Sequence, residues 1–419
     1  MTILSSLSYY LHSPELLNAV RLNLKAFIRN RKLPFPKLIT LMLSGMTASV
    51  QQELDRLSGT LQGSLELLNE ISAQAFSKAR QSVSAKVFRL LNQKFISLVE
   101  THLPIPRWRG LRVVAADASK LQLFLKDATA RKVREAMAFM LYLPGLELTL
   151  DFELYSPSVG ERQMLFEHLQ SLRQDDLLVL DRGYPACWLV AVLLTLGIPF
   201  CIRVDDTGFA AVRQFRRSGL RQAIVTLPPP SAQDAADYGG PRQPRTVRLI
   251  LVVTPNGQRH VLMTSLLDET AYPAAEFADL YHARWRIEEA FKRIKHRLAL
   301  EPLSGLSWLA AQQDFGAKLL CDNLNALAVS AAAPEPITRS GKPTPSENPC
   351  LYKINRTYGF AALKRSLPLW FLQALPSPQD LIRLFAQLLK FVVRYIPGAS
   401  KPRTKSAKPH RYIAYKSIA

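Results

Sequence analysis

Hydrophobic spacing divides the chain into a helical beginning, a strand-rich middle and a helical end. The beginning carries apolar side chains at helical spacing, as in the run from Leu16 to Phe27. From Leu111 the period changes, and the nearly continuous apolar run LRVVAADAS predicts a buried central strand that ends at Asp117. Helical spacing returns near the end of the chain, over 361–375 and 381–393.

The middle of the chain alternates strands and helices. Two further strands, over 134–142 and 146–155, meet at Pro144-Gly145, which is a good turn pair. The pattern then predicts a helix, a buried strand, a second helix and another strand, over 161–172, 176–181, 185–196 and 198–204. Three consecutive strands followed by this alternation predict an α/β fold, a mixed sheet with helices on its faces.

Residues 205–270 interrupt that alternation and indicate a β-rich insertion. They hold the strand-like stretch GLRQAIVTL, a stretch rich in Pro and Gly, and a hairpin. The hairpin pairs 247–253 with 259–264 through Pro255-Asn256-Gly257, a strong turn signal. One long helix is expected from Pro273 to about residue 300, and another over 308–332.

The charge balance of the chain points to a polyanionic partner. Lys and Arg number 54 against 33 Asp and Glu, a net charge of +21. Such an excess favours nucleic acid first and an anionic membrane second, without separating DNA from RNA. The longest apolar run, 188–202, is broken by Gly197 and Pro199, so no membrane span is expected. The four cysteines lack a CxxC spacing and the start lacks a signal peptide, which favours a cytoplasmic protein without structural zinc.

The stretch YHARWRIEEAFKRIK, over 281–295, carries two sets of side chains at helical spacing. Its apolar stripe should face a core, and it includes Ile287, Phe291 and Ile294. Beside that stripe, within about 60° of one another on a helical wheel, lies a polar row of four: Tyr281, Arg284, Glu288 and Lys295. Taken alone, this row is better explained as a solvated face with an i,i+4 pair of Arg284 and Glu288.

The spacing of the four polar residues resembles a known family signature. Tyr, two residues, Arg, three residues, Glu, six residues and Lys is the signature of DDE-type bacterial insertion-sequence transposases of the insertion sequence four family. The resemblance runs from about residue 65 to about residue 365. It implies an RNase H-like core and a DNA transposase that binds terminal inverted repeats, cleaves phosphodiesters with divalent metal and transfers the 3′-hydroxyl ends to target DNA.

Pattern and resemblance together predict six segments. In chain order these are a helical DNA-binding region over 1–105, the first part of an RNase H-like catalytic core over 106–204, the β-rich insertion over 205–270, the second part of the core over 271–332, a linker over 333–350, and a helical C-terminal region over 351–419. The linker is rich in Pro, Ser and Gly. The tail from Lys401 is basic and contains no acid, which is typical of a segment that meets a polyanion.

Three carboxylates are the candidate catalytic residues and metal ligands. Asp117 ends the first predicted strand, Asp181 ends the fourth, and Glu288 lies in the helical row. Adjacent parallel strands would bring the two aspartates together at the carboxyl edge of the sheet. Because grouped acids repel one another unless a cation lies between them, two Mg²⁺ (or Mn²⁺) ions are expected there. Taken singly, each aspartate is more often a turn or helix cap than a catalytic residue.

The candidate DNA contacts fall in two places. In the helical row, Arg284 and Lys295 would bind phosphate oxygens, Tyr281 would donate to another, and Lys292 ranks second. Near the beginning, a helix capped by Ser72 and continuing through SAQAFSKARQSVSAKVFRLL carries basic residues, Lys78 and Arg80. That helix fits a helix-turn-helix reader of DNA and an ordinary helical bundle equally well. The resemblance implies double-stranded transposon ends and target DNA as partners, and a homodimer that pairs two ends.

Two alternatives to the transposase remain open. One is an RNase H-like metal-dependent nuclease without strand transfer, which the acids and the charge fit equally well. The other is a DNA-binding derivative that has lost catalysis, against which the presence of all three acids argues. The route of excision is also open. Some family members flip a base onto a tryptophan of the insertion when they form a hairpin end, and no Trp lies between Asp205 and His282.

Overall fold

The chain forms two compact units, here called the helical unit and the sheet unit. The computed structural model describes residues 2–29, 32–63, 70–126, 131–254, 257–333 and 351–396. The helical unit comprises Met1–Leu103, Leu121–Glu135 and Lys292–Ala419, and the sheet unit comprises Pro104–Lys120 and Ala136–Phe291. Residues 334–350 of the predicted linker, the basic tail and the hairpin-turn residues 255–256 lie outside the described residues. The six predicted segments stay predictions.

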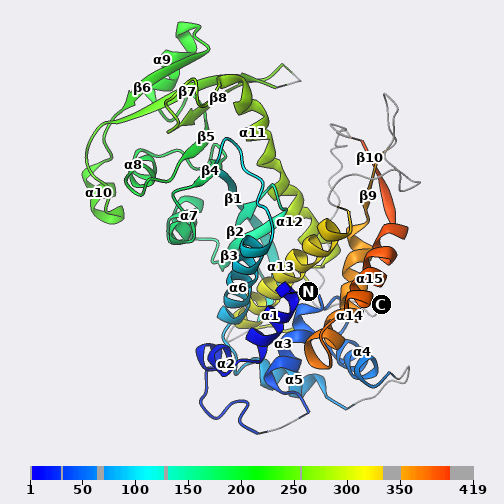
Figure 1. Cartoon of the computed structure of the whole chain (residues 1–419). Coiled ribbons are helices and arrows are strands. Elements are labelled where there is room, and N and C mark those ends of the chain that lie inside the picture. The colour runs from blue at the N-terminus through cyan, green and yellow to red at the C-terminus, as the bar shows by residue number, and fades with distance from the viewer. Residues whose placement is uncertain are drawn as a thin grey trace. The chain divides into compact units, whose positions relative to one another are not determined.

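The sheet unit is built on a mixed sheet to which the described residues contribute eight strands. In chain order these are β1 (Arg112–Lys126), β2 (Arg131–Leu143), β3 (Leu148–Tyr155), β4 (Asp176–Leu180), β5 (Phe200–Val204), β6 (Gln222–Leu227), β7 (Arg245–Val253) and β8 (Arg259–Thr264). Their order across the sheet is β3-β2-β1-β4-β5-β8-β7-β6 (Figure 1). β1, β4 and β5 are parallel, whereas β3 pairs antiparallel with β2. This confirms the predicted mixed sheet, and β3-β2-β1-β4-β5 is the RNase H-like order that the resemblance implied.

The central strands β1 and β4 are apolar because both of their faces are covered. All five residues of β4 are buried, as are Val114, Ala115 and Ala116 of β1. Strands buried on two faces need no alternation of polar and apolar residues. At their shared start, Arg112 and Asp176 form a buried two-bonded ion pair, with Nη2 2.7 Å from Oδ2. This pair fixes the register of the two strands.

The predicted insertion extends the core sheet instead of forming a sheet of its own. Strand β8 pairs antiparallel with the core strand β5, and β7 and β6 follow outward. Two helices that hydrophobic spacing did not predict also lie here, α9 (Ala210–Ser218) and α10 (Ala232–Tyr238). α10 falls inside the stretch rich in Pro and Gly, where Ser231 caps its start and Gly239 ends it at φ +67°. Local capping therefore makes a helix from a sequence that resembles a loop.

The remaining helices of the sheet unit follow the predicted alternation. They are α7 (Glu161–His168), the 3₁₀ turn η1 (Leu169–Ser171), α8 (Cys187–Thr195), the 3₁₀ turn η2 (Ala274–Glu276), α11 (Phe277–Ala283) and the first half of α12 (Trp285–Arg297). The single long helix expected from Pro273 was wrong in this detail. The N–H of Arg284 bonds to the carbonyl of Tyr281 and the N–H of Ile287 to that of Arg284, both at 3.1 Å. These three-residue steps tighten the chain at Arg284 and divide α11 from α12.

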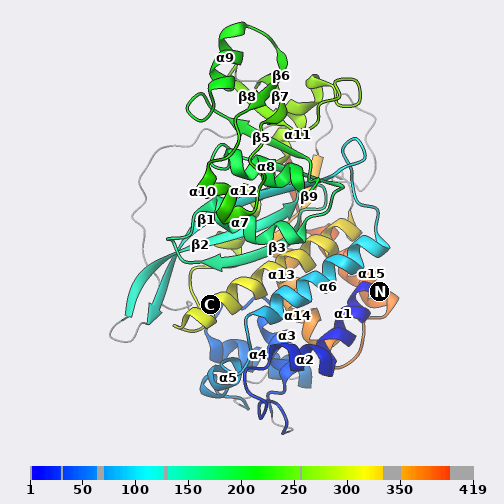
Figure 2. The same ribbon diagram turned by 90° about the vertical axis from the view of Figure 1, so that its left-hand side faces the viewer.

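The helical unit packs around α13 (Trp308–Ala332). Its other described elements are α1 (Thr2–His12), α2 (Pro14–Val20), α3 (Phe35–Leu43), α4 (Val50–Gln62), α5 (Ala73–Arg80), α6 (Lys86–His102), α14 (Arg356–Leu372), α15 (Pro378–Lys390) and the two-stranded ribbon of β9 (Leu351–Ile354) with β10 (Val392–Tyr395). α13 is buried on nearly all sides and contacts α3, α6, α14 and α15 (Figure 2). Within the described residues, no helix has the length and apolar character that crossing a membrane requires.

The helix predicted to continue from Ser72 through residue 91 is two helices. Ser72 does cap its start, because its Oγ accepts a hydrogen bond from the Ala75 N–H at 3.2 Å. However, α5 ends at Arg80, and the Ser84 N–H bonds to the Val20 carbonyl at 2.8 Å while Val83 pairs with Arg21. The segment QSVS has weak helix propensity, so these contacts to the end of α2 outweigh continuation of the helix.

Candidate active site

Asp117 and Asp181 lie at neighbouring positions on the carboxyl side of two parallel strands. Asp181 directly follows β4, as predicted, but the prediction that the first strand ends at Asp117 was wrong, because β1 continues past Asp117 to Lys126. The pairing of β1 with β4 runs from Arg112 with Asp176 to Ala115 with Val179, and the same offset applied beyond it would align Asp117 with Asp181. Each carboxylate accepts the N–H of the next residue, Asp117 at 3.0 Å and Asp181 at 2.7 Å. These local bonds fix the Asp117 side chain in the middle of β1 and the Asp181 side chain just after the end of β4.

The helical row meets Asp181 through two side chains. The Tyr281 hydroxyl, from α11, donates to Asp181 Oδ1 at 3.0 Å. The Arg284 guanidinium donates through Nη2 to Glu288 Oε1 at 3.0 Å, and the same nitrogen lies 3.8 Å from Asp181 Oδ2. Arg284 is buried, with 4% of its side chain exposed. The predicted phosphate ligands Tyr281 and Arg284 are therefore engaged with acids in this structure, and phosphate contact by either stays a prediction.

The two aspartates have opposite electrostatic environments. Burial raises the pKa of Asp117 to about 7, and the charges of Glu161 and Glu288 raise it while Arg284 opposes them. Burial acts in the same sense on Asp181, but Arg284, the following backbone N–H and the Tyr281 hydroxyl outweigh it and lower the pKa of that carboxyl. Asp117 is therefore much more readily protonated than Asp181 near neutral pH. Such a divergence between adjacent acids is typical of functional sites.

The three acids surround one guanidinium rather than a shared central point. Asp117, Asp181 and Glu288 all act on the charge of Arg284. Among the residues that the structure describes, no three or more His, Cys, Asp or Glu side chains are close enough together to hold a metal ion. The donors are nevertheless hard carboxylate oxygens, the type that Mg²⁺ and Mn²⁺ prefer. A bound cation would also remove the free-energy cost of ionising the buried Asp117. The chemistry of these carboxylates therefore suits a divalent ion.

The other predicted DNA contacts have different surroundings. Lys292 and Lys295 lie on the part of α12 that belongs to the helical unit, and both are partly buried. Lys78 is exposed in the last turn of α5. DNA contact by these three lysines stays a prediction.

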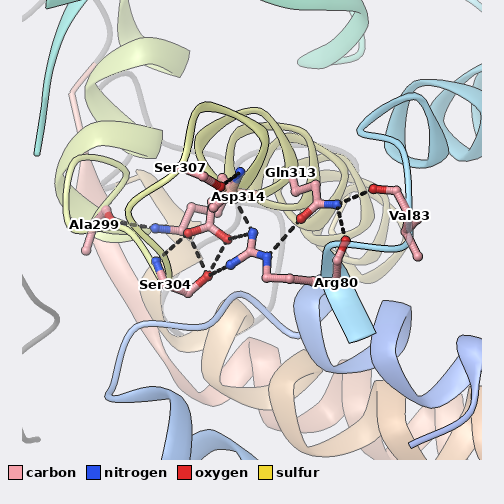
Figure 3. A network of polar contacts seen from close by, with 9 residues as sticks. Arg80, Val83, Ala299, Ser304, Ser307, Gln313 and Asp314 are labelled. Atoms are coloured by element: carbon pink, nitrogen blue, oxygen red, sulfur yellow. Dashed lines mark hydrogen bonds and ion pairs between the residues drawn. The ribbon is translucent and has the colours of Figure 1, made fainter. Parts of the chain in front are cut away.

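The prediction that Arg80 contacts DNA was wrong, because its side chain is enclosed in a polar network (Figure 3). Arg80 is only 3% exposed. Its Nε donates to Gln313 Oε1 at 2.8 Å, its Nη1 to Ser304 Oγ at 2.6 Å, and its Nη2 to the Ala310 carbonyl at 2.9 Å and Asp314 Oδ1 at 3.0 Å. All three guanidinium nitrogens are occupied inside the helical unit, so none is available to a phosphate.

Two further residues border the acids and were not predicted. Glu161 opens α7, and its charge raises the pKa of Asp117. Tyr184, three residues after Asp181, is fully buried, and its hydroxyl has no hydrogen-bond partner among the described residues. The sequence offered no signal that linked either residue to the site, because an acid in the first turn of a helix is ordinary.

Comparison with known proteins identifies the family. A family model described as "Transposase DDE domain" matches residues 108–324. That range includes Asp117, Asp181 and Glu288.

Individual relatives agree with that match. The chain is 25% identical over 317 residues to the transposase InsG for insertion sequence element IS4 of Escherichia coli (strain K12), covering 70% of this chain and 69% of InsG. It is 37% identical over 83 residues to the transposase for insertion sequence element IS421 of Escherichia coli, covering 20% of this chain and 22% of that protein. Among solved structures, a piggyBac transposase synaptic complex with hairpin DNA is similar with a TM-score of 0.43 and 12% identity, over 97% of this chain and 86% of that one. Since the family model covers more than half of the chain and the similarity to InsG spans most of it, the chain belongs to the DDE transposases, in the insertion sequence four family.

Proposed function

We propose that this DDE transposase binds the terminal inverted repeats of its own insertion sequence, hydrolyses phosphodiesters there, and joins the freed 3′-hydroxyl ends to target DNA. One observation carries the proposal. Asp117 lies on β1 and Asp181 directly follows the parallel neighbour β4, and the charges of both aspartates and of Glu288 on α12 act on the Arg284 guanidinium. The net charge of +21 supports a polyanionic partner, and the family makes that partner DNA.

The side chains of the site have distinct roles in this proposal. Asp117, Asp181 and Glu288 supply the carboxylate oxygens that would hold divalent metal, and Tyr281 keeps Asp181 oriented through its hydroxyl. Two Mg²⁺ or Mn²⁺ ions would activate water or a 3′-hydroxyl and stabilise the leaving oxygen of an in-line displacement. Arg284 balances the acids beforehand, and it would then bind a phosphate oxygen of the DNA as a planar fork.

The DNA contacts and the assembly are part of the same proposal. Lys295 and Lys292 on α12, and the exposed Lys78 on α5, would bind phosphates as point charges. Joining two transposon ends to one target requires two active sites, so a homodimer would act in the complex with DNA. Phosphate contacts of this type weaken steeply with salt, and end binding should therefore fall as ionic strength rises.

The test is strand cleavage of DNA duplexes that carry the ends of the element. Wild type should cleave them with Mg²⁺. Asp181→Asn should bind the same ends but cleave them on the order of 10³-fold more slowly, because it lacks a carboxylate that would hold the metal. That factor corresponds to about 4 kcal/mol of lost transition-state stabilisation. Asp175→Asn is a matched control, since Asp175 lies just before the opposite end of β4 and pairs with the exposed Arg107. Cleavage by Asp181→Asn at the wild-type rate would contradict the proposal.

A second assay separates the transposase from the two alternatives. Pre-cleaved ends with free 3′-hydroxyls are mixed with target plasmid, and joined products are measured. Joining by wild type and its loss in Asp117→Asn are expected. Cleavage without joining would identify a nuclease, and end binding without cleavage or joining by wild type would identify a derivative that has lost catalysis.

A further inference from the structure

A fourth carboxylate, that of Glu161, borders the three acids of the sheet unit. Glu161 is the first residue of α7, and its Oε2 lies 3.0 Å from the position that a Cβ on Gly183 would occupy. Arg162 holds the start of the helix to the same loop, because its Nε donates to the Gly183 carbonyl at 3.0 Å. Gly183 follows Asp181 by two residues. The absence of a side chain at Gly183 therefore lets the Glu161 carboxylate approach the loop that carries Asp181.

The Tyr184 hydroxyl lacks a hydrogen-bond partner among the described residues, and the charges of the same acids act on it. The side chain is fully buried, and its oxygen makes no hydrogen bond within the described residues. Burial raises the pKa of Tyr184 well above its usual value, and the charges of Asp117, Glu161 and Asp181 add to that effect. A buried hydroxyl without a partner is uncommon in folded proteins and calls for an explanation. Because the charges of three carboxylates act on this hydroxyl, we expect a group bound at the site to complete its hydrogen bonding.

The balance of charge favours a cation as that group. The negative charges of the four acids raise the pKa of two of them: Glu161 and Glu288 act on Asp117, and Asp181 acts on Glu161. Arg284 is a buried cation on which Asp117, Asp181 and Glu288 act. Two other arginines are nearby but more open to solvent: Arg203, 3.9 Å from Asp181, and the exposed Arg162. One buried cation, Arg284, does not balance the negative charges of the four acids when all are ionised. A bound divalent ion would offset the excess negative charge.

We propose that Glu161 is a fourth acid of the metal site and that the Tyr184 hydroxyl donates a hydrogen bond to the carboxylates that hold the ion. The inference rests on the proposed function, because it adds residues to the same site. Glu161 would bind the ion directly or through a water molecule, and Tyr184 is a positioning residue. Groups that orient ligands in this way typically change metal affinity by ten- to a hundredfold.

A purely structural role for Glu161 makes the opposite prediction. An acid in the first turn of α7 stabilises the helix through its dipole. If this were the whole role, Glu161→Gln would lower the melting temperature equally with and without metal, and it would leave metal affinity unchanged. In our proposal, removing the charge relieves repulsion, so the melting temperature of the metal-free protein stays the same or rises.

The experiment measures Mn²⁺ binding by the full-length protein, using titration calorimetry, and melting temperature with and without Mn²⁺. Glu161→Gln should weaken Mn²⁺ binding by about tenfold or more and shrink the Mn²⁺-induced rise in melting temperature. Tyr184→Phe should weaken binding in the same direction by a smaller factor. Glu167→Gln is the matched control, since Glu167 lies on the same helix, is exposed and pairs with Tyr155 and Gln163. It should bind Mn²⁺ as wild type does.

Reference variants separate failure of this inference from failure of the proposed function. If Asp117→Asn and Asp181→Asn lose Mn²⁺ binding while Glu161→Gln keeps wild-type affinity, the inference is overturned and the three-acid site stands. If the aspartate variants themselves bind Mn²⁺ as wild type does, the metal site of the proposed function fails as well. Should Glu161→Gln not fold, Glu161→Asp retains the charge with a shorter reach, and wild-type Mn²⁺ affinity in that variant would count against the inference.

Discussion

Each unit contains a buried arginine close to acids and hydroxyls. The guanidinium of one is fully hydrogen-bonded, whereas that of the other is not. In the helical unit, Arg80 uses all three guanidinium nitrogens, and Asp314 also accepts the Ser304 N–H and hydroxyl (Figure 3). In the sheet unit, the buried Nε of Arg284 has no partner among the described residues. The Asp117 that acts on Arg284 has a pKa raised to about 7.

The difference separates a structural network from a functional one. A buried network in which every polar group is satisfied makes the fold specific and has no remaining capacity to bind a ligand. A network with an unpaired donor, and with neighbouring acids whose pKa values differ, can still gain hydrogen bonds and charge neutralisation when a ligand binds. We therefore expect the Arg80 network to stabilise the helical unit, whereas under the proposed function the Arg284 network would bind metal and phosphate. Three substitutions test this contrast.

The largest effect on stability is expected from Asp314→Asn in the helical unit. This change leaves the Arg80 guanidinium buried without its counterion, and breaking such a pair from one side costs about 3–5 kcal/mol. The midpoint of urea denaturation should fall accordingly. Arg383→Gln provides the control, because that residue is exposed and lies 3.9 Å from Asp380. A loss no larger than that of the control would mean that the Arg80 network does not stabilise the unit.

An effect of the opposite sign is expected from Asp117→Asn in metal-free protein. The pKa of Asp117 is raised to about 7 in the folded state from an ordinary value of 3.8. Between these values the folded state holds a proton that the unfolded chain has lost, so the wild type loses stability as pH rises. Asparagine does not titrate. The variant should therefore gain on the order of 4 kcal/mol over wild type at pH 8 and little at pH 4.

Melting temperatures across that pH range, measured with a chelator present, check this prediction. The charged groups that act on Asp117 are Arg284, Glu161 and Glu288. Excess Mn²⁺ should reverse the order at pH 8, because the ion stabilises the ionised wild type and has lost a ligand in the variant. A stability difference between the variant and wild type that does not change with pH would show that the pKa of Asp117 is not raised in the folded state.

The smallest of the three effects is expected from Tyr281→Phe, which removes one hydrogen bond to Asp181. A bond of this kind to a charged group contributes about 1.5–3 kcal/mol to stability, so the melting temperature should fall, and cleavage of transposon ends should slow by about tenfold or more because Asp181 loses the hydroxyl that orients it. Tyr155→Phe is the matched control, since Tyr155 donates to Glu167 at 2.8 Å outside the site. Equal slowing by both variants would remove Tyr281 from the site.

The parts of the site that the sequence predicted are those that local patterns determine. The apolar runs that end at Asp117 and Asp181 specified two buried strands, and buried parallel strands place their carboxyl ends together. The spacing of Tyr281, Arg284 and Glu288 specified one face of a helix, and a periodic segment is the most dependable sequence signal. The structure brings Tyr281 and Arg284 within reach of Asp181, and Glu288 contacts Arg284.

The parts that the sequence did not predict depend on contacts between distant segments. Arg80 resembles a surface residue on an amphipathic helix, and its partners Ser304, Gln313 and Asp314 lie more than 200 residues away. The approach of Glu161 to Gly183 and the burial of Tyr184 depend likewise on how α7 packs. Tertiary contacts of this kind override local propensity, and spacing along the chain does not encode them.

The most direct test of the central claim is the location of a divalent ion in the protein. Crystals grown with Mn²⁺ would be measured at a wavelength that reveals manganese by anomalous scattering. We predict a peak within coordination distance of the Asp117 and Asp181 carboxylates, with Glu288 turned toward it and away from Arg284. Manganese bound only elsewhere, with both aspartates still facing Arg284, would contradict the assignment of these acids to one metal-dependent active site.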